Sequence, residues 1–234
     1  MLVGLTESGK STFIDGLVNY VFDTRFEDTH RLRLVNLTKD ESSKFWKETI
    51  SQTDYISVYK IKCLDGMNVN YDLTIVDTPG FGDSRGDQHD EQLMQDIFCL
   101  LQRSVIHQLD AIGFVAKAGD THLTERQRYV YNGMVRMFGS KVSRNMFSVL
   151  TNYDGHSANI MEVFKENHIN FVDNFCLNSK VIKNPPEEGF CLNENDLNGS
   201  LEVVQFHSFF KEARRLCELI SKMNPFFLEI HKLN

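Results

Sequence analysis

The chain alternates between segments with an apolar residue at every third or fourth position and short, nearly continuous apolar runs. The first pattern predicts amphipathic helices, and the second predicts buried strands. The predicted helices span residues 12–22, 88–108, 124–138, 158–172 and 203–223. The predicted strands span residues 2–3, 55–62, 71–76, 111–116, 146–150 and 175–177. Strands that alternate with helices favour an α/β fold with a mostly parallel sheet.

The connections between these elements refine the picture. Asp65-Gly66 is a hairpin signal between two β-rich segments, so one antiparallel strand is expected at an edge of the sheet. Residues 23–50 are polar and predict a surface segment with a short helix around Phe45 and Trp46, and residues 183–200 predict a loop. The first apolar run is shorter than the five or so residues of a typical strand. We therefore expect a truncated first strand and missing sequence upstream of Met1.

A phosphate-binding loop is predicted near the start of the chain. Residues 4–11 match the pattern G-x-x-x-x-G-K-[ST] in full. Gly4 and Gly9 let the backbone curl so that successive N–H groups face phosphate oxygens. Lys10, which we expect to be solvated, neutralises the outer phosphates, and the Ser11 hydroxyl binds Mg²⁺. The other candidate phosphate-binding residues of this loop and of the helix that follows are Thr6, Glu7, Ser8 and Thr12.

A second candidate phosphate-side segment follows the strand at residues 71–76. Asp77-Thr78-Pro79-Gly80 begins where that strand ends, 67 residues after Lys10. An Asp at the carboxyl end of a strand can hold Mg²⁺ through water, so Asp77 is a candidate metal ligand. The Gly80 N–H can reach the γ-phosphate. Lys10 and Gly80 are therefore candidate catalytic groups.

Together, the phosphate loop and the string Asp77-Thr78-Pro79-Gly80-Phe81-Gly82-Asp83 resemble the septin and immune-associated (AIG1-type) branch of the P-loop GTPases. The resemblance covers about residues 1–180. It implies a three-layer G domain, which we place at residues 1–200, with residues 201–234 adding a C-terminal helix packed on the domain. It also implies GTP or GDP and Mg²⁺ as cofactors, and a homodimer or oligomer formed through the nucleotide face.

The same resemblance implies further site residues. A threonine from the first switch completes the Mg²⁺ shell and takes part in catalysis; Thr53 fits best, and Thr49 and Ser51 are rivals. The guanine reader resembles [NT]-K-x-D and falls at residues 151–154, where Asp154 accepts hydrogen bonds from guanine. The remaining candidate base-binding residues are Thr151, which ties this loop to the phosphate loop, Asn152, which replaces the usual Lys and predicts reduced affinity, and Ser179 in the last loop.

Turnover is expected to be slow. The residue after D-x-x-G is Phe81 here, whereas Ras-like enzymes place a water-orienting Gln at that position. Arg85 is a candidate arginine finger across a dimer, or a solvated loop charge. The expected function is a GTP-binding switch or assembly unit. The alternatives are a P-loop ATPase or nucleotide kinase, and a degenerate nucleotide-binding scaffold.

Composition excludes several other classes. The net charge of −7 argues against a broad basic surface for nucleic acid. No run approaches the ~18 apolar residues that span a bilayer, so no transmembrane segment is expected. The five cysteines include no C-x-x-C pair, which is typical of reduced thiols in a cytoplasmic protein.

Overall fold

The computed structural model describes residues 1–35, 55–103, 108–156, 158–183, 185–186 and 201–227. The strands are β1 (Leu2–Gly4), β2 (Ser57–Ile61), β3 (Leu73–Asp77), β4 (Gln108–Leu109), β5 (Ile112–Lys117), β6 (Met146–Thr151), β7 (Asn174–Cys176) and β8 (Phe226–Phe227). The helices are α1 (Lys10–Val21), α3 (Asp87–Arg103), α4 (Glu125–Phe138), α5 (Asn159–Glu166), α6 (Lys180–Lys183), α8 (Leu201–Lys222) and the 3-10 helix η1 (Ser140–Asn145).

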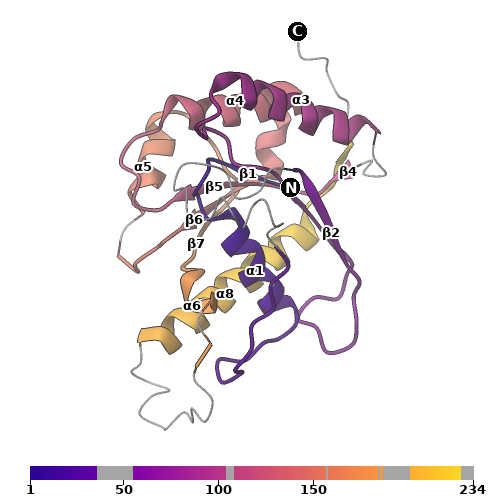
Figure 1. Cartoon of the computed structure of the whole chain (residues 1–234), viewed down its shortest axis with the longest axis vertical. Helices are drawn as coiled ribbons and strands as arrows, with labels where there is room; N and C mark the ends of the chain where they lie inside the picture. Colours follow the sequence, from indigo (N-terminus) through magenta and orange to yellow (C-terminus); the bar gives the residue numbers. More distant parts are fainter. Residues whose placement is uncertain (36–54, 104–107, 157, 184, 187–200, 228–234) are drawn as a thin grey trace.

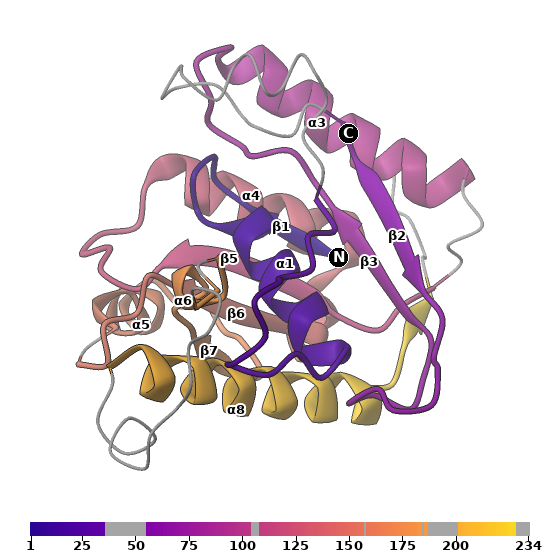
Figure 2. The same ribbon diagram turned by 60° about the horizontal axis from the view of Figure 1, so that its bottom comes forward.

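The central sheet confirms the predicted α/β architecture. Its strand order is β2-β3-β1-β5-β6-β7, and every neighbouring pair is parallel except β2 with β3. The antiparallel strand β2 lies at an edge, as the hairpin signal predicts. Helices α1, α6 and α8 cover one face of the sheet, and α3, α4 and α5 cover the other (Figures 1 and 2). The result is a three-layer fold with one hydrophobic core on each side of the sheet.

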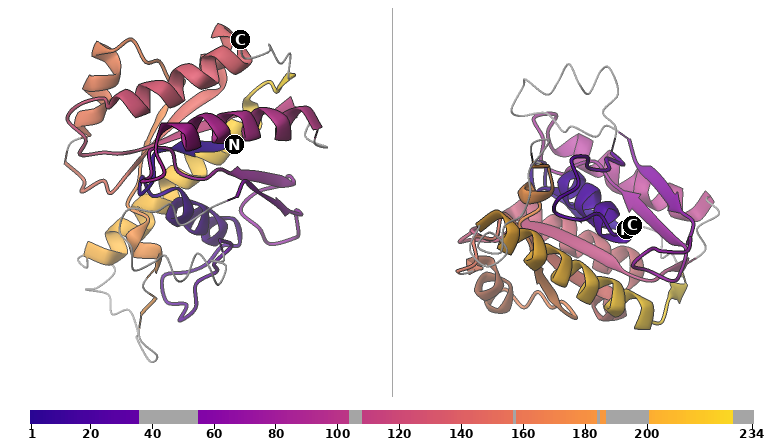
Figure 3. Two further views of the ribbon diagram at one scale, coloured as in Figure 1. Left: turned by 45° about the horizontal axis from the view of Figure 1, so that its top comes forward. Right: turned by 90° about the horizontal axis from the view of Figure 1, so that it is seen from below.

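The long C-terminal helix α8 packs directly on α1. In the right-hand view of Figure 3, α8 crosses in front of the strands. A Cβ built on Gly16 of α1 would lie 2.4 Å from Cζ of Phe209 in α8, so only a glycine allows this approach. Phe206, Phe209 and Leu216 are buried in the same core as the apolar face of α1. α8 therefore closes the hydrophobic layer on this face of the sheet.

The predicted helix at residues 158–172 is wrong in its second half. α5 ends at Glu166, and His168 adopts a left-handed backbone with φ of 55°. After this turn Phe171 packs against Phe114 and Phe164, with ring centroids 5.6 and 5.1 Å away. Packing of the partly buried Phe171 ring against strand and helix favours the break over continued helical periodicity.

Three other predictions need correction or cannot be placed. The predicted helix at 88–108 is too long at its end, because Gln108–Leu109 form β4, which pairs antiparallel with β8. Lys183, predicted to begin a loop, is the last residue of α6. The predicted short helix around Phe45 and Trp46 lies outside the described residues. Among the residues that are described, no helix is long and apolar enough to cross a membrane.

Candidate nucleotide-binding site

The phosphate loop lies between the end of β1 and the start of α1, at the carboxyl edge of the parallel strands. Its backbone is curled: Glu7 and Gly9 have φ of 60° and 94°. A Cβ on Gly4 would lie 2.4 Å from the carbonyl oxygen of Val115 in β5, and this distance excludes any side chain. Gly9 is the N-cap of α1, so the free N–H groups and partial positive charge of that helix face the loop.

Lys10 is buried, which corrects the expectation that it is solvated. The residue is only 7% exposed. Its Nζ donates hydrogen bonds of 3.1 Å to the carbonyls of Gly4 and Leu5. Burial lowers the Lys10 pKa to about 8, although the nearby Asp77 carboxylate acts in the opposite direction. The ammonium group is thus held inside the loop by the loop's own carbonyls.

The segment that begins at Asp77 is joined to the phosphate loop by main-chain contacts. The Thr6 N–H donates to the carbonyl of Phe81 at 2.8 Å, and the Phe81 N–H donates to the carbonyl of Gly4 at 3.1 Å. A Cβ on Gly80 would lie 2.5 Å from Cα of Thr6. The two candidate phosphate-binding segments, far apart in sequence, therefore form one continuous surface, with the buried Asp77 at its base.

The predicted guanine loop also contacts the phosphate loop. The Thr151 hydroxyl donates to the carbonyl of Ser8 at 2.6 Å, which is the tie that the sequence predicts. Asn152 has a left-handed backbone, φ 55°, and the Tyr153 N–H donates to the carbonyl of Leu177 at 3.3 Å. Asp154 is exposed, and one of its carboxylate oxygens accepts a hydrogen bond from the His156 N–H at 3.0 Å. The phosphate loop, the guanine loop and the loop at 177–179 thus lie next to one another.

Buried hydroxyl groups test whether these residues fit a nucleotide. Within the part of the chain that the structure describes, Oγ1 of Thr6 and Oγ of Ser8 and Ser179 are buried and have no hydrogen-bond partner. Such groups are costly unless something satisfies them. All three belong to predicted nucleotide-binding residues, so the loops fit a polar, phosphate-bearing ligand.

The predicted Mg²⁺ ligands are only partly described. Ser11 lies in the first turn of α1, and Asp77 is the last residue of β3. Thr53 and its rivals Thr49 and Ser51 lie outside the described residues. Thr12 is half-buried in the first turn of α1.

Sequence reasoning missed two side chains of α1 that hold the segment before residue 36. Asn19 is fully buried; its amide donates to the carbonyl of Leu32 at 2.7 Å and its oxygen accepts from the Leu32 N–H at 3.0 Å. An Asp15 oxygen accepts from the N–H groups of Leu34 and Val35 at 2.9 and 3.1 Å. Burial raises the Asp15 pKa, and these two backbone donors act against the rise. A signal existed in the sequence, since polar residues four positions apart interrupt an otherwise apolar helix.

Arg85 is exposed in its loop, as expected for a loop charge at the surface. Its guanidinium pairs with the buried carboxylate of Asp83, with Nε donating to Oδ2 at 2.6 Å. Burial alone would raise the Asp83 pKa, but the Arg85 contacts outweigh it and hold the pKa below its ordinary value. Nearby, the Asp90 carboxylate accepts the Gly82 N–H at 2.8 Å.

Comparison with known families agrees with this geometry. The AIG1 family model matches residues 56–185, which is more than half of the chain. The chain belongs to the AIG1 family. The septin model also matches, over residues 1–109. No curated protein matches the sequence of this AIG1-family chain.

Similar solved structures show the same fold. Toc33 from Arabidopsis thaliana in complex with GDP and Mg²⁺ aligns with a TM-score of 0.59 and 13% identity, covering 97% of this chain and 86% of that one. Toc33 with Mg²⁺ and GMPPNP aligns with a TM-score of 0.55 and 11% identity, over 99% and 86% of the two chains. A structure of the chloroplast translocon components atToc33 and psToc159 has a TM-score of 0.54 and 12% identity, over 98% and 84%. The chain therefore has the fold of these G domains.

We predict that Asn19→Ala lowers the free energy of unfolding by about 2 kcal/mol, because it removes two hydrogen bonds to Leu32 and leaves both of that residue's backbone groups to find other partners. Urea denaturation would measure the change. Asn170→Ala is the matched control, since Asn170 is exposed and its hydrogen bonds are long, at 3.4 Å. Equal unfolding free energies for the two variants would contradict the structural role of Asn19.

Proposed function

We propose that the protein binds GTP and GDP together with Mg²⁺, and hydrolyses GTP slowly. The observation that supports this most is the hydrogen bond from the Thr151 hydroxyl to the Ser8 carbonyl. It holds the loop that carries Asp154 against the loop that carries Lys10. A single ligand with a base at one end and phosphates at the other can then contact both loops.

Each predicted residue has a defined task in this proposal. The Lys10 ammonium exchanges the carbonyls of Gly4 and Leu5 for phosphate oxygens. The N–H groups of the loop and of Gly80 donate to the phosphates, and the Asp154 carboxylate accepts from the guanine N1–H and amine. Ser11, Asp77 and Thr53 hold Mg²⁺, which when bound neutralises charge on the β- and γ-phosphates.

Titration of the protein with labelled GTP and labelled ATP, each with Mg²⁺, tests the proposal. We expect saturable binding of GTP at concentrations where ATP does not bind. Toc33, a structure of similar fold, was crystallised with GDP and with GMPPNP. Equal affinity for ATP would instead support a P-loop ATPase or nucleotide kinase.

We predict that Asp154→Asn weakens GTP binding by at least about tenfold and improves binding of xanthosine triphosphate. Hydrogen bonds to a charged acceptor contribute about 1.5–3 kcal/mol, which sets the scale of the loss. The amide can donate to the 2-oxo group of xanthine, whereas the carboxylate cannot. Fluorescence titration with GTP and with xanthosine triphosphate measures both affinities. Asp65→Asn in the exposed hairpin turn is the control. If the Asp154 variant keeps wild-type affinity for both nucleotides, the guanine reader is elsewhere.

We predict that GTP affinity falls by about tenfold between pH 7 and pH 9. The Lys10 pKa is about 8 in the free protein, and a bound triphosphate stabilises the charged form. Above pH 8 the free protein has lost this proton and must regain it on binding, so the dissociation constant rises with pH.

Isothermal titration at several pH values measures this dependence. Lys10→Arg is the matched control, because arginine stays charged throughout the range, and its affinity should not change between pH 7 and pH 9. Lys10→Ala should lose at least about tenfold in affinity at pH 7. The same pH slope in Lys10→Arg as in the wild type would exclude Lys10 as the titrating group.

Slow turnover is supported by two side chains. Phe81 is fully buried in the core, so neither its position nor its chemistry can orient a water molecule. Moving Arg85 to another chain would leave the buried Asp83 charge uncompensated, which is costly. We therefore infer that Arg85 orders its own loop and that any arginine finger comes from a different residue.

We further propose a homodimer formed through the nucleotide face. Dimerisation is important for the GTPase activity of atToc33 and psToc159, which share the fold. A second copy could supply the catalytic group that Phe81 does not.

We predict slow single-turnover GTP hydrolysis at low protein concentration, on the order of 10⁻⁴ to 10⁻² s⁻¹, and a rate that rises with concentration. Quenched-flow or manual sampling over a hundredfold concentration range measures it, with sedimentation velocity run in parallel. A fast rate that is independent of concentration would reveal a catalytic group within one chain. Tight GTP binding without turnover at any concentration would favour a nucleotide-binding scaffold.

A further inference from the structure

The short stretch of residues 80–82 is held from two sides. It includes Gly80, whose N–H group is the candidate donor to a γ-phosphate. On one side lies the phosphate loop, which exchanges main-chain hydrogen bonds with Phe81 and forms a parallel bridge to it at Leu5. On the other side lies the first turn of α3, where both carboxylate oxygens of Asp90 accept the Gly82 N–H, at 2.8 and 3.1 Å. The backbone of this stretch is therefore fixed between one loop and one helix.

Asp90 is an ionisable side chain in a buried position. The residue is only 4% exposed, although it lies in the first turn of a helix. Burial raises the pKa of its carboxyl, whereas the Gly82 N–H and the charges of Arg126 and His89 act to lower it, and the charge of Asp83 acts to raise it. A buried carboxylate is costly unless it accepts hydrogen bonds. The contact with Gly82 thus stabilises the side chain as well as the backbone that it holds.

Arg126 of α4 covers the same glycine. Gly82 has φ of 76°, and a Cβ there would lie 2.8 Å from Cδ of Arg126. The guanidinium of Arg126 pairs in turn with Asp87 at the start of α3, with Nη2 3.4 Å from Oδ1. Helices α3 and α4 lie on the same face of the sheet (Figure 2). Gly82 is therefore enclosed by the first turns of two helices, one of which accepts its N–H group.

The place of this contact separates the γ-phosphate from the rest of a guanine nucleotide. In the proposed site, Asp154 contacts the base, which GTP and GDP share. The Gly80 N–H is placed for the γ-phosphate, which only GTP has. A donor that is held in place before the ligand arrives loses less conformational freedom on binding. Fixing residues 80–82 in the free protein should therefore strengthen GTP binding more than GDP binding.

We propose that Asp90 is a positioning residue that favours GTP over GDP. Through the Gly82 N–H, it holds the backbone of Gly80 in the geometry that receives a γ-phosphate. The carboxylate acts on the nucleotide only through this backbone and is not a catalytic group. The inference rests on the proposed function, because a preference for GTP exists only if the site binds guanine nucleotides.

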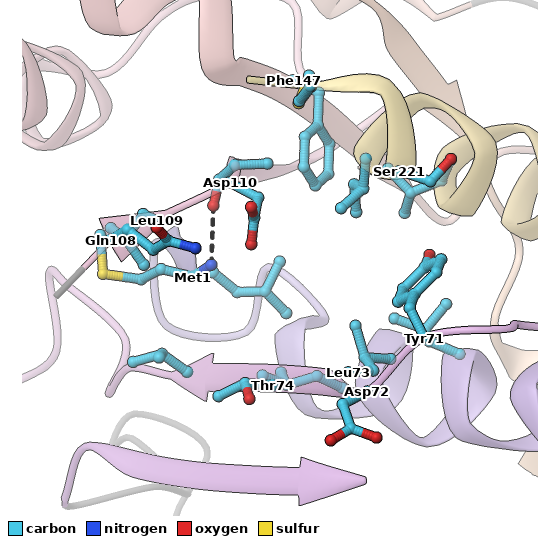
Figure 4. A pocket seen from close by; sticks show the side chains of 18 of the residues that line it. Met1, Tyr71, Asp72, Leu73, Thr74, Gln108, Leu109, Asp110, Phe147 and Ser221 are labelled. Carbon is cyan, nitrogen blue, oxygen red and sulfur yellow. Dashed lines mark hydrogen bonds between the residues drawn. The ribbon is translucent and has the colours of Figure 1, made fainter. Parts of the chain in front are cut away.

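Three variants of the full chain test the proposal: Asp90→Ala, Asp90→Asn and Asp72→Ala. Asparagine keeps a side-chain oxygen that can accept the Gly82 N–H. Asp72 is the matched control, because it also accepts a backbone N–H, from Cys63 at 3.0 Å. It lies at the other end of β3 from Asp77, beside a cavity of about 490 Å³ at the amino ends of the strands (Figure 4).

Isothermal titration with GDP and with GMPPNP, each with Mg²⁺, gives the ratio of the two affinities. GMPPNP is a GTP analogue that keeps its γ-phosphate. We expect Asp90→Ala to lower the preference for GMPPNP over GDP by about tenfold, and Asp90→Asn to lower it by no more than about threefold. Asp72→Ala should leave the ratio unchanged. A loss that is equal for the two nucleotides, or no loss for either, would overturn the role of Asp90.

Hydrogen exchange of the wild-type protein gives a second test that needs no variant. The Gly82 amide should be protected in the free protein, and GDP or GMPPNP should not slow its exchange further. Exchange should speed up at least about tenfold in Asp90→Ala and stay the same in Asp72→Ala. A Gly82 amide that becomes protected only when GMPPNP binds would overturn the proposal, because the stretch would then not be held beforehand.

These measurements distinguish failure of this inference from failure of the proposed function. A wild-type protein that binds neither nucleotide would overturn the proposed function, and the preference assigned to Asp90 with it. A wild-type protein that binds both nucleotides, together with an unchanged ratio in Asp90→Ala, would overturn the role of Asp90 alone.

Discussion

Close main-chain contact between the phosphate loop and its neighbours is the constraint on which the site depends. The loop exchanges two hydrogen bonds with the Phe81 backbone, and Gly80 lies against Thr6 with no room for a Cβ. Gly4 meets the Val115 carbonyl of β5 just as closely. Because these contacts involve backbone atoms, no side-chain rearrangement can relieve a larger residue at Gly4 or Gly80. The position of every donor in the loop is therefore set by the packing of β1 between β3 and β5.

The burial of Lys10 follows from the curled backbone of the phosphate loop. The curled backbone that turns N–H groups inward also brings the carbonyls of Gly4 and Leu5 within hydrogen-bond distance of the Lys10 ammonium group. Those carbonyls and the Asp77 charge offset part of the desolvation of the side chain, but not all of it, so the pKa stays low. A phosphate group is a stronger partner than two carbonyls. The charge is thus kept close to where a phosphate is expected, at a cost to the free protein that binding relieves.

Much of the fold and of the site could be predicted because their signals are local. Alternating apolar periods indicate the strand and helix order, and the spacing of Gly4, Gly9 and Lys10 reflects the backbone geometry of one loop. The missed features depend on distant contacts. Asn19 bonds to Leu32 in an irregular segment, and α5 ends early because Phe171 packs on Phe114. Likewise, the pairing of β4 with β8 joins two dipeptides more than a hundred residues apart, too short for any periodic signal.

Helix α1 runs along the sheet from the carboxyl ends of the strands toward their amino ends. It carries polar residues at its start and apolar residues on its buried face. Its first turn carries Lys10 and Ser11, whereas Phe13 and Leu17 on its buried face line a cavity at the amino ends of the strands. Ligands of open α/β sheets bind at the carboxyl ends of the strands, where loops can vary while the sheet stays intact. Beyond its first turn, the same helix packs its apolar side chains into the hydrophobic core, so these residues contribute to the stability of the sheet. The predicted nucleotide contacts and the packing of the hydrophobic core therefore involve opposite ends of the same helix.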